Sequence, residues 1–112
     1  MDESAFLAAA AATLDRIGLS LDAALETSNA RFAWQLTDGV LLIELAGDAR
    51  IVVRRDVARR AIVVEAGGAA VDFVPHEGRW RDARGEALRD ALVRLLKAQA
   101  RVSVRMPELP AP

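Results

Sequence analysis

The sequence predicts an α+β fold, an αβ sandwich in which two helices pack on one face of a five- to six-stranded antiparallel sheet. Two segments with helical apolar spacing lie toward the ends of the chain, and short alternating segments with glycine-containing turns lie between them. Helices that flank such a meander can both bury their apolar stripes only by covering the same sheet face. The 112 residues are expected to form a single domain, 1–112.

The first helix is predicted over residues 2–26, where apolar side chains recur at helical spacing and Ser4 is a candidate N-cap. Gly18 lowers helix stability by about 1 kcal/mol relative to alanine, so the helix either continues through it or ends early. The second helix is predicted over residues 86–98. Its apolar stripe consists of Leu88, Leu92, Leu95 and Leu96.

Alternation of apolar and polar residues predicts the strands of the meander. They are expected at 31–36, 40–45, 50–55, 61–66 and 69–73, with a short edge strand at 79–81. The pair Asp38-Gly39 is typical of a two-residue hairpin turn. The proline-containing tail beyond the second helix is expected to be extended, and either to cover the groove between the helices or to fray.

The composition excludes several classes of function. There is no cysteine, so the chain has no thiolate metal site, disulfide or cysteine nucleophile of its own. The chain also lacks tyrosine and a glycine-rich phosphate loop, and its single histidine, His76, has no second metal ligand at a recognisable spacing. We therefore expect a protein that is not an enzyme. The apolar run 5–14 is too short to span a bilayer and acidic residues precede it, which favours the cytoplasm.

Charge is distributed unevenly along the chain. The formal net charge is −1, but residues 1–48 contain eight acids and two bases, a balance of −6, whereas residues 49–112 contain thirteen bases and eight acids, a balance of +5. Two interpretations remain open at this point. The two halves either compensate each other in the folded chain or present oppositely charged surfaces to partners.

A charged stretch with a central tryptophan, "GRWRDARGEAL", occupies residues 78–88 and leads into the second helix. Together with "DESAF" at 2–6, "IGLSLD" at 17–22, "DGVLLIEL" at 38–45 and "RIVVRR" at 50–55, it resembles the bacterial frataxins, the CyaY family. The resemblance covers nearly the whole chain. It implies the frataxin fold, which agrees with the αβ sandwich expected from periodicity.

The resemblance also implies a function. Bacterial frataxins are accessory proteins of iron–sulfur cluster assembly and of iron homeostasis. They bind iron (Fe²⁺ or Fe³⁺) weakly and labilely through exposed carboxylates, and they dock on the cysteine desulfurase, with the iron–sulfur scaffold protein as a further candidate partner. By this resemblance, the metal-binding candidates in the present chain are Glu3, Asp15, Asp22 and Glu26. Hard oxygen ligands suit iron in these oxidation states, and few converging ligands give low affinity.

The resemblance further implies a partner-binding surface on the sheet. Family positions in the third and fourth strands correspond by this comparison to Arg54, Asp56 and Ile62. Trp80 has two interpretations, a structural one in which it covers the sheet edge and a functional one in which it anchors an interface. The partner-binding candidates are Asp22, Glu26, Arg54, Arg55, Asp56, Ile62 and Trp80.

A second functional hypothesis is a diverged frataxin-fold interaction module without iron binding, which uses a basic sheet face for another protein or a polyanion. Arginines such as Arg50, Arg54 and Arg55 would then contact the partner. The pI of about 5.8 disfavours a dedicated nucleic-acid binder, so nucleic acid is not an expected partner. In either case we expect a monomer without a membrane partner.

Overall fold

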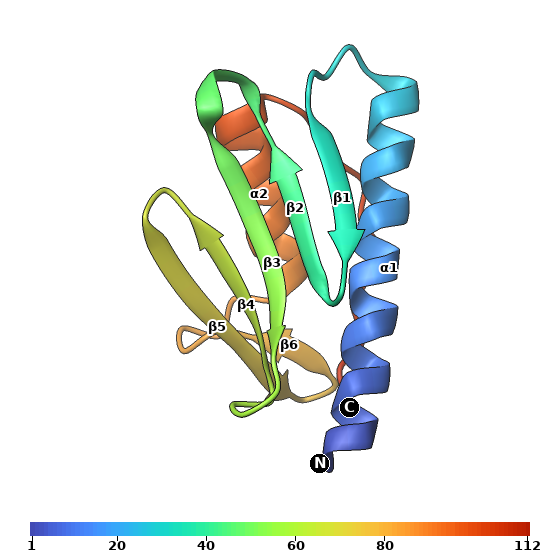
Figure 1. Ribbon diagram of the computed structural model, residues 1–112, viewed down its shortest axis with the longest axis vertical. Coiled ribbons are helices and arrows are strands. Elements are labelled where there is room, and N and C mark those ends of the chain that lie inside the picture. The colour runs from blue at the N-terminus through green and yellow to red at the C-terminus, as the bar shows by residue number, and fades with distance from the viewer.

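The computed structural model describes residues 1–112, and it contains two helices and a six-stranded antiparallel sheet (Figure 1). The elements are α1 (Glu3–Thr27), β1 (Ala33–Thr37), β2 (Val40–Glu44), a 3₁₀ turn (Ala46–Asp48), β3 (Arg50–Asp56), β4 (Ala61–Ala66), β5 (Ala69–His76), β6 (Arg79–Arg81) and α2 (Leu88–Ala100). The strands are hydrogen-bonded in sequence order from β1 to β6. The predicted αβ sandwich, including the short edge strand, is confirmed.

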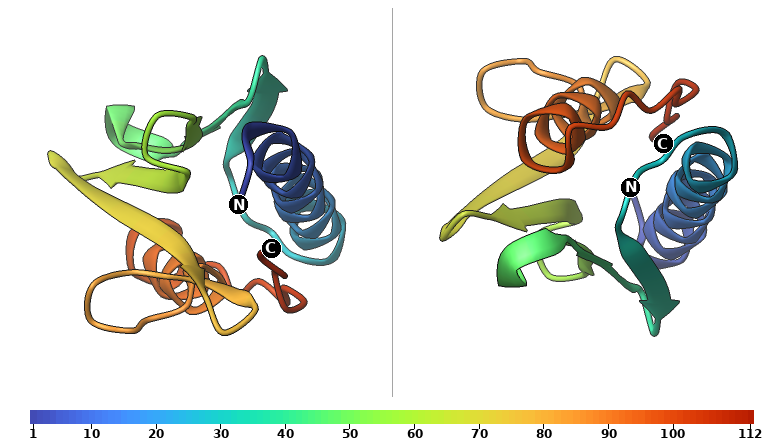
Figure 2. Two further views of the ribbon diagram at one scale, coloured as in Figure 1. Left: turned by 90° about the horizontal axis from the view of Figure 1, so that it is seen from below. Right: turned by 90° about the horizontal axis from the view of Figure 1, so that it is seen from above.

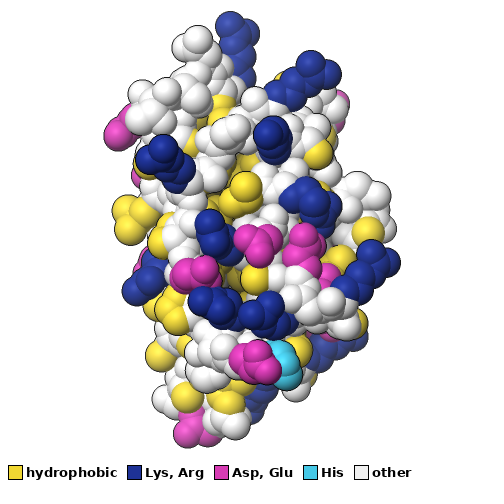
Figure 3. Space-filling model, turned by 180° about the vertical axis from the view of Figure 1, so that it is seen from behind, with side chains coloured by type: hydrophobic (Ala, Val, Ile, Leu, Met, Phe, Trp, Pro, Cys, Tyr) yellow, Lys and Arg dark blue, Asp and Glu magenta, His cyan; other side chains and the backbone are white.

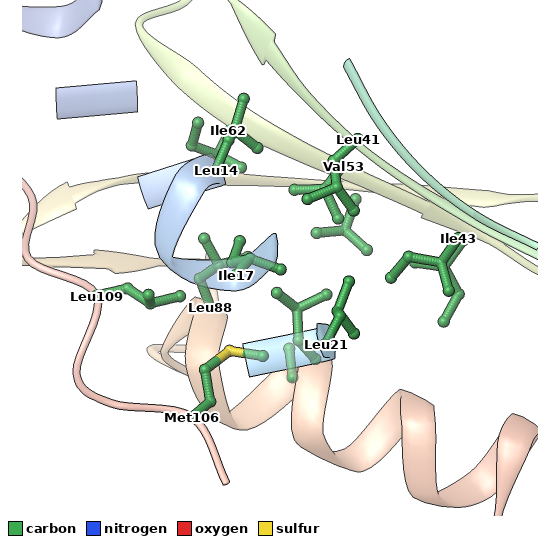
Figure 4. Packing of buried hydrophobic residues seen from close by; sticks show 14 of the residues in the cluster. Leu14, Ile17, Leu21, Leu41, Ile43, Val53, Ile62, Leu88, Met106 and Leu109 are labelled. Carbon is green, nitrogen blue, oxygen red and sulfur yellow. The ribbon is translucent and has the colours of Figure 1, made fainter. Parts of the chain in front are cut away.

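Both helices cover the same face of the sheet, as Figure 2 shows in views along the molecule's long axis. The core between these two layers is a single cluster of 23 buried residues. Figure 4 shows how α1, the strands, α2 and the tail each contribute to it. Labelled examples are Leu14, Ile17 and Leu21 from α1, Leu41, Ile43, Val53 and Ile62 from the sheet, Leu88 from α2, and Met106 and Leu109 from the tail.

Helix α1 begins one residue later than predicted and has a different cap. Asp2, in extended backbone conformation, accepts a hydrogen bond from the Ala5 amide at 2.7 Å, so Asp2 and not Ser4 is the N-cap. An aspartate cap also places negative charge at the positive end of the helix dipole. The helix continues through Gly18 without a break.

Helix α1 is long and apolar enough, by length and composition, to cross a membrane. The core helix of a folded domain satisfies the same criteria, and the packing of α1 is of this kind. Nine of its 25 residues are buried against the sheet and the tail, among them Phe6, Ile17 and Leu21.

Three hairpins have two-residue turns in which both central residues have positive φ. They are Asp38-Gly39 between β1 and β2, Gly67-Gly68 between β4 and β5, and Glu77-Gly78 between β5 and β6. This backbone twist matches the right-handed twist of paired strands. The hairpin predicted at Asp38-Gly39 is confirmed.

The final helix begins two residues later than predicted because a tight loop precedes it. Oδ1 of Asp82 accepts hydrogen bonds from the amides of Arg84 and Glu86, at 2.9 and 2.8 Å. The Asp82 amide donates to the carbonyl of Glu86 at 3.0 Å. Residues 82–86 therefore form a loop, and α2 starts at Leu88.

The C-terminal tail covers the groove between the helices, one of the two outcomes expected for it (Figure 2). Its alternate side chains Val102, Val104 and Met106 are buried, as is Leu109. The Ala111 amide donates to the carbonyl of Gly78 at 2.9 Å, which joins the tail to the β5–β6 turn. The tail is thus part of the core.

Two predicted partner-binding residues prove to be core residues. Ile62 is 0% exposed because its register places it opposite Arg55 and Phe73, on the helix-facing side of the sheet. Trp80 is also 0% exposed, and its Nε1 donates to Oγ1 of Thr13 in α1 at 3.0 Å. Its ring meets Phe6 edge-on at a centroid distance of 6.0 Å. Neither side chain can contact a partner, and the structural interpretation of Trp80 is the correct one.

Candidate interaction surfaces

No ion pair joins the acidic and basic halves of the chain. All eight ion pairs lie within residues 54–108, and the eight carboxylates of residues 1–48 take part in none. These carboxylates belong to Asp2, Glu3, Asp15, Asp22, Glu26, Asp38, Glu44 and Asp48. The carboxylates of α1 form no ion pair and project a negative potential from the helix, whereas Glu44 lies directly opposite Arg50 in the β2–β3 ladder. Of the two interpretations of the charge asymmetry, the structure supports oppositely charged surfaces.

The acidic stripe on α1 is continuous because the helix does not break at Gly18. Asp15, Asp22 and Glu26 are exposed and share one helical face by their spacing of seven and four residues. Glu3 is exposed near the start of the helix, on a different face by its spacing. No three acidic or histidine side chains in the molecule lie close enough to hold a metal ion together. Metal binding at this stripe would therefore rely on one or two side chains and water.

Asp22 is oriented by the first strand. Nε1 of Trp34 in β1 donates a hydrogen bond to Oδ1 of Asp22 at 2.9 Å. The indole reaches α1 over Gly18, where the missing side chain leaves room for the ring. This contact engages one carboxylate oxygen of Asp22, and the other oxygen of this exposed residue forms no hydrogen bond within the chain.

The outer face of the sheet is less basic than its arginines suggest. Nε of Arg54 pairs with Oε1 of Glu65 at 2.6 Å, and Nη1 of Arg59 pairs with Oδ2 of Asp72 at 2.7 Å. Val63 lies between these pairs on the outer face and is nevertheless only 1% exposed. The charged side chains thus cover Val63 and neutralise each other.

Two further predicted partner-binding residues lie apart from each other. Asp56 is on the outer side of β3, where its carboxylate accepts the amide of Arg59 at 3.2 Å and so closes the β3–β4 loop. Arg55 has the same register as Ile62, on the helix-facing side, and its guanidinium packs on the turn at Gly39. Arg55 is therefore half-buried and separate from the outer-face arginines.

Sequence reasoning missed an apolar patch at the centre of the outer face. Val40, Leu42 and Val52 occupy outward positions of β2 and β3, and Val40 is 41% exposed. Leu42 and Val52 are direct cross-strand neighbours. The signal was present in the sequence, because strands with apolar residues at successive positions have apolar side chains on both faces. We call these three residues the outer apolar patch.

On the opposite side of the molecule, seen in Figure 3, lysine and arginine side chains are spread widely, with acidic ones between them. Nε of Arg79 and Nη1 of Arg89 both contact Glu108 of the tail, at 2.5 and 3.4 Å. A hydrogen bond and charge attraction from Glu86 raise the pKa of Arg94. Nε2 of His76 lies 3.6 Å from Oε1 of Glu77, and His76 has no second metal-binding neighbour.

The chain is similar in sequence to a known protein family and to two curated relatives. Residues 1–102 match the model of the family described as "Frataxin-like domain". The chain is 31% identical over 107 residues to a protein from Ralstonia nicotianae, covering 95% of each chain, and 38% identical over 102 residues to one from Dechloromonas aromatica, covering 89% of this chain and 93% of the relative. Both relatives are named iron-sulfur cluster assembly protein CyaY.

A solved structure agrees with these sequence matches. The frataxin of Psychromonas ingrahamii superposes with a TM-score of 0.79 over 96% of this chain and 100% of that one. The two sequences are only 18% identical, so this likeness concerns the fold.

Proposed function

The chain belongs to the bacterial frataxin (CyaY) family, and from this premise we propose that it is an accessory protein of iron–sulfur cluster assembly that docks on the cysteine desulfurase through its acidic side. The observation that carries the proposal is the absence of any ion pair between the carboxylates of residues 1–48 and the basic half of the chain. Free carboxylates complement a basic partner surface and accelerate association with it.

Asp22 and Glu26 are the residues that we assign to this contact. Both are exposed, and they lie one helical turn apart on α1. The indole of Trp34 holds Asp22 in place, so less side-chain entropy is lost when a partner arginine or lysine pairs with it. Interface charges of this kind raise the association rate, and salt weakens their effect.

The outer apolar patch supports a second contact, for which the scaffold protein of cluster assembly is the candidate. Its apolar centre is flanked by the charged pair of Arg54 and Glu65 and by Gln35, an arrangement of apolar core and polar rim found in protein interfaces. In this proposal Arg54 and Asp56 belong to the rim, and no residue is catalytic.

Iron binding is proposed as weak and labile, with Fe²⁺ or Fe³⁺ as cargo carried by Asp15, Asp22 and Glu26, and with Glu3 as a separate ligand near the start of α1. Carboxylate oxygens suit these cations. The lack of any three converging ligands supports low affinity and loss of the ion to a competing site.

The alternative function is an interaction module without iron binding that uses its basic residues for another protein or a polyanion. The arginines that favour it are those without an acidic partner, such as Arg50 and Arg60. Pairing of Arg54 and Arg59 with acidic side chains on the outer face reduces its support.

The test is calorimetric binding to the cysteine desulfurase of the same bacterium, at low and at physiological salt. We expect Asp22→Lys with Glu26→Lys to weaken binding by roughly tenfold or more. The matched control is Glu77→Lys with Asp90→Lys, which changes the net charge equally at exposed positions of the other half. Equal weakening by both double variants would attribute binding to net charge alone, and unchanged binding in the first would favour the alternative function.

A further inference from the structure

The sheet has an open edge at β5, which takes no part in the contact proposed for the acidic stripe on α1. Strand β5 extends from Ala69 to His76, but β6 pairs only with Val74, Pro75 and His76. Residues 69–73 therefore have a hydrogen-bonded neighbour on one side only, which is β4. Unpaired strand edges are sites where another extended chain can add.

Hairpin geometry identifies the backbone groups that this edge offers. The two-residue turn Gly67-Gly68 makes Ala66 and Ala69 a hydrogen-bonded pair, and such pairs recur at alternate positions in an antiparallel ladder. Ala69, Val71 and Phe73 accordingly bond to β4. The N–H and C=O groups of Ala70 and Asp72 point to the open side, and no hydrogen bond outside the β4–β5 ladder engages them.

Two grooves meet at this edge. One, of about 790 Å³, runs from the outward-facing Ala70 and Asp72 to the loop at Arg84. The other, of about 210 Å³, lies on the helix side, where Val71 and Phe73 face Ala91 and Leu95 of α2. Val71 lines both grooves and is 40% exposed. A strand added here would place alternate side chains in the two grooves.

The charges that line the larger, outer groove indicate which side chains an added strand would place there. It is lined by four arginines against three acids, and Arg84 forms no ion pair. An acidic side chain in this groove would meet Arg84 and Arg59, whereas the inner groove is mainly apolar. We propose that the open edge of β5 binds an extended peptide segment of a partner protein in which acidic and apolar residues alternate.

The test uses the full chain and a short synthetic peptide that alternates glutamate and valine, with a lysine–valine peptide as control. Amide hydrogen exchange followed by NMR is expected to slow at Ala70 and Asp72 when the glutamate peptide is added, and to change little at Val71, whose amide already bonds to β4. Failure of the peptide to bind, or binding without protection at Ala70 and Asp72, would overturn the proposal.

Two variants separate the charge from the backbone contribution. Arg84→Glu, in an exposed loop, is expected to weaken binding of the glutamate peptide roughly tenfold, the effect of about one charged hydrogen bond. Ala70→Pro removes the backbone N–H at position 70, which points to the open edge and forms no hydrogen bond to β4, so this variant is expected to weaken peptide binding. Ala70→Thr keeps this N–H and is the control. Equal binding by the lysine and glutamate peptides would overturn the charge assignment. Concentration-dependent dimers with Ala70 and Asp72 protected without peptide would assign the edge to a second copy instead.

Discussion

The indole of Trp34 occupies the space that a side chain at Gly18 would fill. A Cβ atom built at Gly18 would lie 2.6 Å from Cη2 and 2.9 Å from Cζ3 of Trp34, closer than such atoms approach in proteins. The same indole donates its N–H to Asp22 one turn further along α1. The glycine that weakens helix propensity therefore allows the first strand to pack on the helix and to orient an acidic residue.

We expect Gly18→Ala to destabilise the protein, although alanine is the better helix former by about 1 kcal/mol. Displacing the indole should cost about 1–3 kcal/mol as overpacking and loss of the hydrogen bond to Asp22. Chemical denaturation measures the free energy of unfolding. The control is the same change in a Trp34→Ala background, where it should stabilise the chain, and destabilisation in both backgrounds would contradict this explanation.

Trp34 should report iron binding at Asp22. Because its Nε1 lies 2.9 Å from the Asp22 carboxylate, Fe²⁺ bound there should quench Trp34 fluorescence, whereas Trp80 is fully buried. A titration of the native chain is compared with Trp34→Phe, which retains only Trp80, and with Asp22→Asn, which removes the charge at nearly constant shape. Quenching that survives in Asp22→Asn would place the cation elsewhere.

Thr13 should contribute to stability through its contact with Trp80. Thr13→Val keeps the side-chain shape but leaves the buried indole N–H without its acceptor, which should cost about 1–3 kcal/mol. Thr27→Val is the control, because Thr27 is an exposed threonine of the same helix. The two free energies of unfolding are compared by denaturation, and equal losses would show that the Trp80 contact carries no special stability.

The tail should behave as core and not as a loose end. Leu109→Ala removes a side chain that is 2% exposed and should cost about 2–5 kcal/mol. Glu108→Ala, next to it, removes only exposed ion pairs to Arg79 and Arg89 and should cost about 1 kcal/mol or less. Thermal unfolding of both variants distinguishes the two effects. A small loss for Leu109→Ala would mean that the tail detaches without unfolding the domain.

Local patterns in the sequence were sufficient for most of the fold. The strands, their order and the two helices followed from spacing and from turn residues such as Asp38-Gly39, because these signals act over a few residues. The observed starts of the two helices differ from the predicted ones because a side-chain hydrogen bond sets each start. The Asp2 cap and the loop held by Asp82 are examples, since several residue types near each end were compatible with either choice.

The candidate site was less predictable. Assigning Ile62 to the surface was wrong because side chains alternate between the two faces of a strand, and the register of β4 places Ile62 on the helix-facing side. At Trp80 the same alternation of polar and apolar residues correctly indicated a buried side chain. It stands between Arg79 and Arg81, and both arginines are more exposed than the tryptophan.

The sequence by itself determined the αβ sandwich, the membership of the frataxin family and the uneven distribution of charge, because each depends on composition or on short-range order. Tertiary structure decided which charges stay free. Glu65 pairs with Arg54 of the neighbouring strand β3, and Asp72 pairs with Arg59 of the β3–β4 loop, whereas the carboxylates of α1 form no ion pair. Such pairing depends on contacts between residues that are separated in the chain. The open edge of β5 was decided in the same way, since it exists only because β6 is shorter than its neighbour.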